Sequence, residues 1–109
     1  MHDPRPLVGV LCNGADDSGV AVESIRSVYI AALTESAHVD CMILPTGLAT
    51  DAARRIVARL DGVVLSGAES NVAPERYGVR HRETHLDMPR DASAFHLIAA
   101  SLRMKTPLL

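Results

Sequence analysis

Residues 60–78 read LDGVVLSGAESNVAPERYG. A turn at Asp61-Gly62 leads into a short apolar strand from Val63 to Leu65, and this strand ends at the small residues Ser66-Gly67-Ala68. In open α/β sheets, ligands bind beyond the carboxyl ends of the strands. A loop of small residues lets backbone N–H groups approach a ligand, although Gly67 can equally serve only to end the strand. This stretch therefore predicts an α/β sheet with a candidate ligand loop.

The rest of the chain alternates between apolar runs and helical patterns. The pattern predicts strands at 7–11, 41–44, 63–65 and 106–109, a turn-rich loop at 12–19, a long loop at 67–90, and helices at 23–36, at 52–60 and from Asp91 onward. Thr50 and Asp51 are candidate caps for the second helix. The third helix is expected to bury the stripe Phe95, Ile98, Ala99 and Leu102. Strict alternation of this kind indicates a parallel sheet with right-handed crossovers and helices on both faces.

The last four residues, Thr106-Pro107-Leu108-Leu109, look like the start of a fourth strand. A parallel strand needs neighbours and covering helices, so we expect residues 1–109 to be the first half of a longer domain. An exposed strand edge also invites pairing, and a homo-oligomer formed through this fourth strand is therefore expected.

Composition narrows the classes of function. The chain has 109 residues, a formal net charge of -2 and three aromatic side chains, so neither a nucleic-acid partner nor an anionic membrane surface is expected. No apolar signal region or membrane-spanning run is present, which predicts a cytoplasmic protein. Cys12 and Cys41 are then expected to be reduced and buried. No Gly-x-Gly-x-x-Gly or P-loop pattern follows a strand, so no cofactor is expected. For the same reason, a flavin- or nucleotide-binding domain is the weakest of the functional hypotheses for this chain.

Several motifs along the chain carry a family resemblance. They are residues 61–67, Ser70-Asn71-Val72, Pro74, Tyr77-Gly78 and Arg90-Asp91, with further agreement at residues 6–10, Tyr29 and Leu44-Pro45. Together they resemble the class I glutamine amidotransferase-like hydrolases, and most closely the gamma-glutamyl-gamma-aminobutyrate hydrolases of peptidase family C26. The resemblance covers essentially the whole chain. It implies a flavodoxin-like α/β/α domain, here truncated in the fourth strand.

The resemblance also implies hydrolysis of a small gamma-glutamyl amide through a thioester on the cysteine of a Cys-His-Glu triad. In the family, that cysteine lies in a Gly-Ile-Cys-Arg-Gly-like elbow after the fourth strand, and the His and Glu come later. No catalytic side chain is therefore expected within residues 1–109, and the chain alone is predicted to be inactive. The backbone N–H groups of Gly67 and Ala68 would form half of an oxyanion hole. Asn71, Arg90 and Asp91 would contact substrate or brace the long loop and the third helix.

Other polar residues have simpler explanations. His81, Glu83, His85 and Asp87 match no common zinc spacing, so no metal site is expected. His38 and His96 are expected at the surface, and Cys12 is expected to have a structural role. A non-catalytic α/β binding or interaction module, completed by self-association or by a partner, remains the alternative to a hydrolase.

Overall fold

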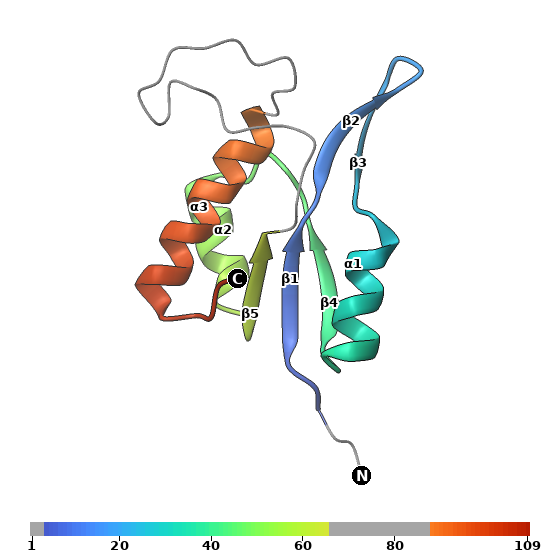
Figure 1. Cartoon of the computed structure of the whole chain (residues 1–109). Coiled ribbons are helices and arrows are strands. Elements are labelled where there is room, and N and C mark those ends of the chain that lie inside the picture. Colours follow the sequence, from blue (N-terminus) through green and yellow to red (C-terminus); the bar gives the residue numbers. More distant parts are fainter. Residues whose placement is uncertain (1–3, 66–87) are drawn as a thin grey trace, which may run out of the picture.

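The computed structural model describes residues 4–65 and 88–109, and in this part of the chain a three-stranded parallel sheet forms the centre. Strand β1 (Leu7–Leu11) lies between β4 (Asp40–Leu44) and β5 (Gly62–Leu65), as Figure 1 shows. The pairing places Leu11 beside Leu44 and Leu65, so all three strands finish at the same edge. The apolar run of β1 fits its central position, because a central parallel strand is covered on both faces. In β4, which lies at the edge of these three strands, Met42 and Ile43 are about half exposed.

The last residues of the chain extend this sheet next to β5. The Val63 N–H donates to the Pro107 carbonyl at 2.9 Å, and the Leu109 N–H donates to the Val63 carbonyl at 2.9 Å. Val63 and Leu108 form a parallel bridge. Residues 107–109 thus run beside β5 in the parallel direction, at an isolated bridge outside the three strands of the sheet.

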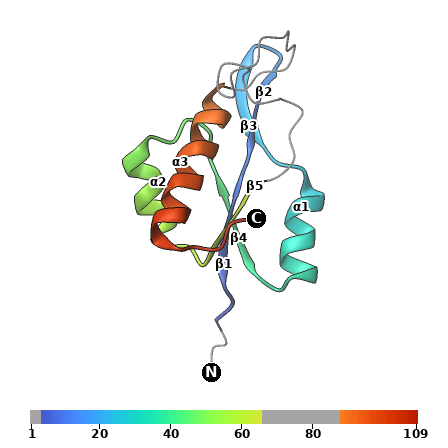
Figure 2. The ribbon, with the colours of Figure 1, turned by 60° about the vertical axis from the view of Figure 1, so that its left-hand side comes forward.

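Helices cover both faces of the sheet, as the alternating pattern predicted (Figure 2). Helix α1 (Ser27–Ala31) continues into the π-helical turn η1 (Ala32–Ser36) on one face. Helices α2 (Thr50–Val57) and α3 (Met88–Met104) pack together on the other face. The α/β class predicted from the sequence is therefore confirmed.

The segment after β1 differs from the prediction. It is an antiparallel hairpin of β2 (Asn13–Asp17) and β3 (Val20–Ser24), where a loop and the first residues of a helix were predicted. The turn residues Ser18 and Gly19 have φ angles of 53° and 86°, and two consecutive positive values favour a tight two-residue hairpin turn. Glu23 consequently lies in a strand, and the first helix begins four residues later than predicted.

Two details of the later helices were also predicted wrongly. Helix α2 begins at Thr50, with Ala49 as the capping residue, so neither Thr50 nor Asp51 caps it. Helix α3 begins at Met88 rather than at Asp91, and the predicted stripe faces outward: Phe95 is 40% exposed and Leu102 is 71% exposed. The fully buried face of α3 instead carries small and polar residues around one large side chain: Ser93, Leu97, Ala100 and Ser101.

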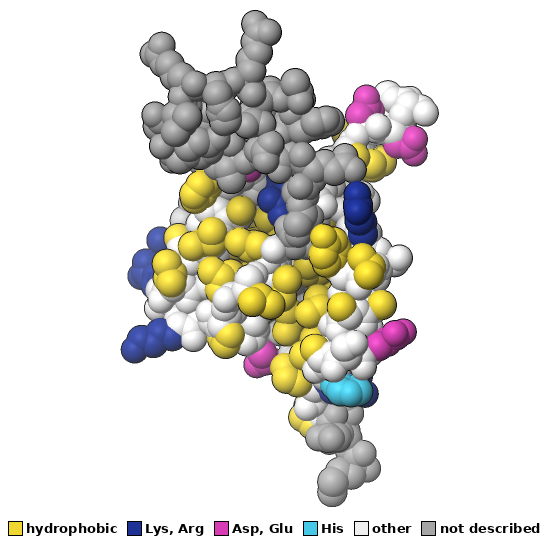
Figure 3. Space-filling view, viewed as in Figure 1, with side chains coloured by type: hydrophobic (Ala, Val, Ile, Leu, Met, Phe, Trp, Pro, Cys, Tyr) yellow, Lys and Arg dark blue, Asp and Glu magenta, His cyan; other side chains and the backbone are white. Residues whose placement is uncertain are grey.

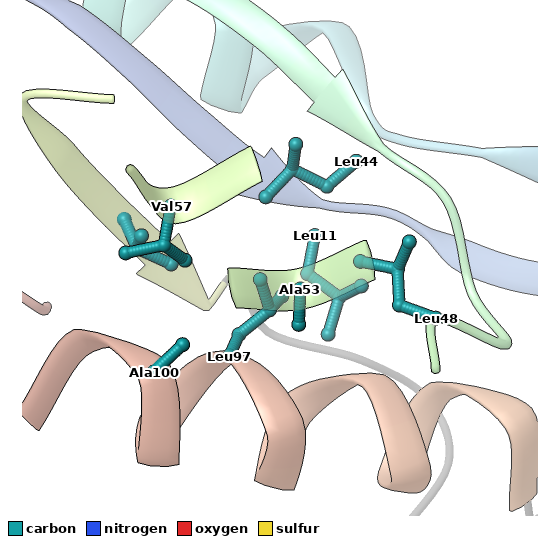
Figure 4. Close-up of a cluster of buried hydrophobic side chains, with 8 residues drawn as sticks. Leu11, Leu44, Leu48, Ala53, Val57, Leu97 and Ala100 are labelled. Carbon is teal, nitrogen blue, oxygen red and sulfur yellow. The ribbon is translucent and has the colours of Figure 1, made fainter. Parts of the chain in front are cut away.

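The core lies between the sheet and the pair α2 and α3 (Figure 4). It is built from eight buried apolar side chains contributed by three strands, two helices and one loop: Leu11, Leu44, Leu48, Ala53, Val57, Val63, Leu97 and Ala100. Gly9, in the central strand, lies against this cluster. A Cβ atom at this position would lie 2.7 Å from methyl groups of both Leu44 and Leu60. A glycine in the central strand therefore makes room for the side chains of Leu44 and Leu60.

Candidate site at the carboxyl edge of the sheet

The carboxyl edge of the parallel sheet gathers the ends of several segments. Cys12 follows β1, Pro45 follows β4, and Leu65 ends β5. The β2–β3 hairpin and the first turn of α3 lie at this same end of the molecule (Figure 1). Ligand sites of open α/β sheets form at this edge, so it is the candidate site.

One carboxylate connects three of the segments at this edge. Oε1 of Glu23, in β3, accepts hydrogen bonds from both the backbone N–H and the hydroxyl of Thr46, the latter at 2.5 Å. The Cys12 thiol donates to the same oxygen at 3.8 Å, and the Cys12 N–H donates to the Leu44 carbonyl at 3.0 Å. The base of the hairpin is thus joined to the ends of β1 and β4.

The electrostatics of this cluster disfavour the thiolate form of Cys12. Hydrogen bonds from the Thr46 hydroxyl and then from its N–H lower the pKa of Glu23, so the carboxylate stays charged at neutral pH. Burial and, secondly, this nearby charge raise the pKa of the Cys12 thiol. A nucleophilic cysteine needs the opposite surroundings. The structural role predicted for Cys12 therefore agrees with its position, where only 1% of its surface is exposed.

The loop after β4 is also fixed from the other side, by α3. The Gly47 N–H donates to the Pro89 carbonyl at 3.0 Å, and the Leu48 N–H donates to the Ser93 hydroxyl at 2.7 Å. Nδ1 of His96 lies 2.6 Å from the Leu48 carbonyl. Residues 45–48 therefore form a bridge between the hairpin and the first two turns of α3.

The residues predicted to form the site fall into two groups. Gly67, Ala68 and Asn71 lie outside the described residues, and so do the four metal-ligand candidates at positions 81, 83, 85 and 87. Arg90 and Asp91 are described, and both are buried in the first turn of α3. Asp91 places a carboxylate at the positive end of the helix dipole, which is a stabilising position.

The histidines and cysteines complete this comparison. His38 is exposed as predicted, whereas His96 is half-buried against the loop after β4. Both cysteines carry free thiols, but Cys41 is only half-buried.

Among residues 4–65 and 88–109, no three His, Cys, Asp or Glu side chains are grouped closely enough to hold a metal ion. In the same described ranges, every helix is too short or too polar to cross a membrane.

The sequence reasoning missed the Glu23–Thr46 pair. Glu23 was assigned to the start of a helix, where its side chain would have no reason to face the loop after β4. The signal that could have found the pair is the turn dipeptide Ser18-Gly19 followed by the β-branched residues Val20 and Val22, because such a dipeptide marks a turn and such residues favour a strand. With that hairpin in place, Glu23 lies opposite Gly14, three residues beyond the end of β1.

Comparison with known proteins identifies the family. Residues 6–109 match the family model described as Peptidase C26. The chain is 30% identical over 105 residues to a gamma-glutamyl-gamma-aminobutyrate hydrolase of Escherichia coli O157:H7, and 29% identical over 105 residues to one of Shigella sonnei. In each case the alignment covers 95% of this chain and 41% of the relative, so the chain spans less than half the length of these curated proteins. The chain belongs to the Peptidase C26 family.

Proposed function

We propose that this chain forms the amino-terminal part of a gamma-glutamyl amide hydrolase domain, whose catalytic triad is supplied by polypeptide outside these 109 residues. The observation that carries the proposal is the Peptidase C26 match across residues 6–109. The relatives named above are hydrolases of gamma-glutamyl-gamma-aminobutyrate and extend well beyond the aligned region. The substrate class proposed here is accordingly a small gamma-glutamyl amide.

The strand order supports a flavodoxin-like arrangement for the whole domain. In sequence order of the parallel strands, β4-β1-β5 is second-first-third, and residues 107–109 add the next strand beside β5. This is the beginning of the order 2-1-3-4-5, which has its crevice at the carboxyl edge. The candidate site described above lies at that edge.

The apolar surface supports a larger domain as well. Hydrophobic side chains gather across the middle of the face shown in Figure 3, around the point where Figure 1 marks the C-terminus. Leu102 and Leu109 are 71% and 85% exposed. Contiguous exposed apolar surface marks an interface, and further polypeptide of the same domain would cover it.

The chemistry proposed for the complete domain is acyl transfer through cysteine. A thiolate supplied outside this chain attacks the gamma-carbonyl carbon, the C–N bond breaks, and the amine leaves with a proton from the triad histidine. Water then cleaves the thioester to release glutamate. The backbone N–H groups of Gly67 and Ala68 would stabilise the oxyanion, at about 3 kcal/mol for each donor. Cys12 is not the proposed nucleophile, because its surroundings raise the pKa of its thiol.

The test begins with the coding sequence beyond the codon for Leu109. We expect the reading frame to continue into a Gly-x-Cys-x-Gly elbow, followed later by a histidine and a glutamate. The complete product should release gamma-aminobutyrate from gamma-glutamyl-gamma-aminobutyrate, and changing the elbow cysteine to serine should abolish that release. A stop codon directly after Leu109, or a continuation without the elbow, would refute the hydrolase and favour the non-catalytic module. A folded complete protein that does not hydrolyse the amide would also refute it.

A further inference from the structure

The β2–β3 hairpin projects past the carboxyl edge of the sheet, beside the region where α3 begins (Figure 1). It leaves the sheet directly after Cys12 and returns at Ser24, so its base lies at the candidate site. Its outer half is exposed on both strands, from Gly14 to Ala21. Its orientation relative to the sheet therefore depends strongly on contacts made near its base.

Glu23 provides such contacts at the base. A single oxygen, Oε1, accepts from two donors of Thr46 and from the thiol of Cys12. Thr46 itself belongs to the bridge that Gly47 and Leu48 attach to α3. The carboxylate thus joins the hairpin to a loop that is already held in place by other elements.

We propose that Glu23 is a positioning residue, which holds the β2–β3 hairpin beside the carboxyl edge of the sheet as one wall of the substrate site. The wall role rests on the function proposed above, whereas the holding role does not. Glu23 touches no reacting atom in this proposal. It acts through Thr46, by fixing where the hairpin stands.

The holding role can be measured on the 109-residue chain through the accessibility of Cys12. In a Cys41→Ser background, the alkylation rate of Cys12 is compared between Glu23→Ala and Glu23→Gln. Both variants remove the negative charge that raises the pKa of the thiol, but only glutamine keeps an acceptor oxygen for Thr46. Because glutamine also keeps an acceptor for the thiol, each rate is divided by the thiolate fraction obtained from the pH dependence of alkylation in the same variant. We expect Cys12 to be alkylated roughly tenfold faster in Glu23→Ala than in Glu23→Gln. A ratio of this size corresponds to the loss of a hydrogen bond to a fixed acceptor.

Two controls separate release of the hairpin from general unfolding. Local opening gives an alkylation rate that does not change at low urea, whereas opening by global unfolding gives a rate that rises with urea. Asp16→Ala removes a carboxylate from the exposed half of the same hairpin and should leave the rate unchanged. Thr46→Val is used if Glu23→Ala does not fold. It keeps the N–H donor and loses the hydroxyl donor, so it should raise the alkylation rate over that of the Cys41→Ser background, by less than about tenfold. Equal rates in Glu23→Ala and Glu23→Gln, or no increase in Thr46→Val, would overturn the holding role.

The wall role is tested in the complete protein with gamma-glutamyl-gamma-aminobutyrate. We expect Glu23→Ala to raise KM about tenfold with kcat within about twofold, and Glu23→Gln to restore most of the loss, since a misplaced wall weakens binding more than chemistry. An unchanged KM would overturn the wall role. A complete protein that neither binds nor hydrolyses the amide would remove the wall role together with the proposed function, while the alkylation rates would still decide whether Glu23 holds the hairpin.

Discussion

The assignment of the buried and exposed faces of α3 can be tested by truncating one leucine on each face to alanine. Leu97 is fully buried in the core, and Leu102, five residues later on the same helix, is 71% exposed. Leu97→Ala deletes three buried carbon atoms, worth about 0.8 kcal/mol each, and leaves a cavity that adds to this loss. We expect a loss of about 3 kcal/mol in the free energy of unfolding. Leu102→Ala removes atoms already largely in water and should cost less than about 1 kcal/mol.

The assay is urea unfolding of the 109-residue chain, followed by far-ultraviolet circular dichroism. With a slope of about 1–3 kcal/mol per molar urea, Leu97→Ala should lower the midpoint by about 1–3 M, and Leu102→Ala by less than about one third of that shift. The two variants share helix, residue type and deletion, so each serves as the control for the other. Equal shifts, or a larger shift for Leu102→Ala, would mean that α3 packs through the stripe of Phe95 and Leu102, and would refute the packing described here.

Three further predictions concern the central strand, the bridge to α3 and the hairpin base. Gly9→Ala should destabilise the chain by about 1–3 kcal/mol, because its Cβ would meet two leucine methyl groups at 2.7 Å, whereas Gly62→Ala, with no neighbour closer than 3.6 Å, should be tolerated in the same urea assay. Ser93→Ala leaves the buried N–H of Leu48 without its acceptor and should cost about 1–3 kcal/mol, whereas Ser93→Thr, which keeps the hydroxyl, should cost less. The lowered pKa of Glu23 stabilises the fold above its ordinary pKa of 4.5, and this stabilisation is lost as the pH falls through the lower value of the folded state. Thermal unfolding between about pH 5 and pH 3 should therefore show a steeper loss of stability for the natural chain than for Glu23→Gln; parallel curves would contradict this.

The parts of the fold that the sequence predicted correctly are those with a strong local signal. The apolar runs at 7–11, 41–44 and 63–65 became the three parallel strands, with boundaries shifted by no more than one residue. The second helix, predicted at 52–60, forms at Thr50–Val57, and its residues Ala53 and Val57 lie in the core. A short apolar run bounded by turn residues has few other ways to bury its side chains, so local pattern is sufficient there.

The candidate site could be predicted only in outline. The carboxyl edge follows from strand direction, and a loop after β5 was expected there, but Gly67, Ala68 and Asn71 lie outside the described residues and remain predictions. Glu23 and Thr46 lie 23 positions apart in sequence, and their contact depends on a hairpin that was not foreseen. Asp16 and Asp17 are the carboxylates nearest to Cys12 in sequence, whereas the carboxylate that raises the pKa of its thiol is that of Glu23.

The sequence by itself determined the α/β class, the alternation of strands and helices, and the family, because these depend on apolar runs and motifs that are continuous along the chain. Tertiary structure decided which face of α3 is buried and which groups meet at the carboxyl edge. On α3, the apolar spacing of Phe95, Ile98 and Leu102 predicted the wrong face, since the buried face carries Ser93, Ala100 and Ser101 around Leu97. Close packing of a helix against its neighbours favours small side chains at the contact, and periodicity of hydrophobic residues along one helix carries no information about the space its neighbours leave.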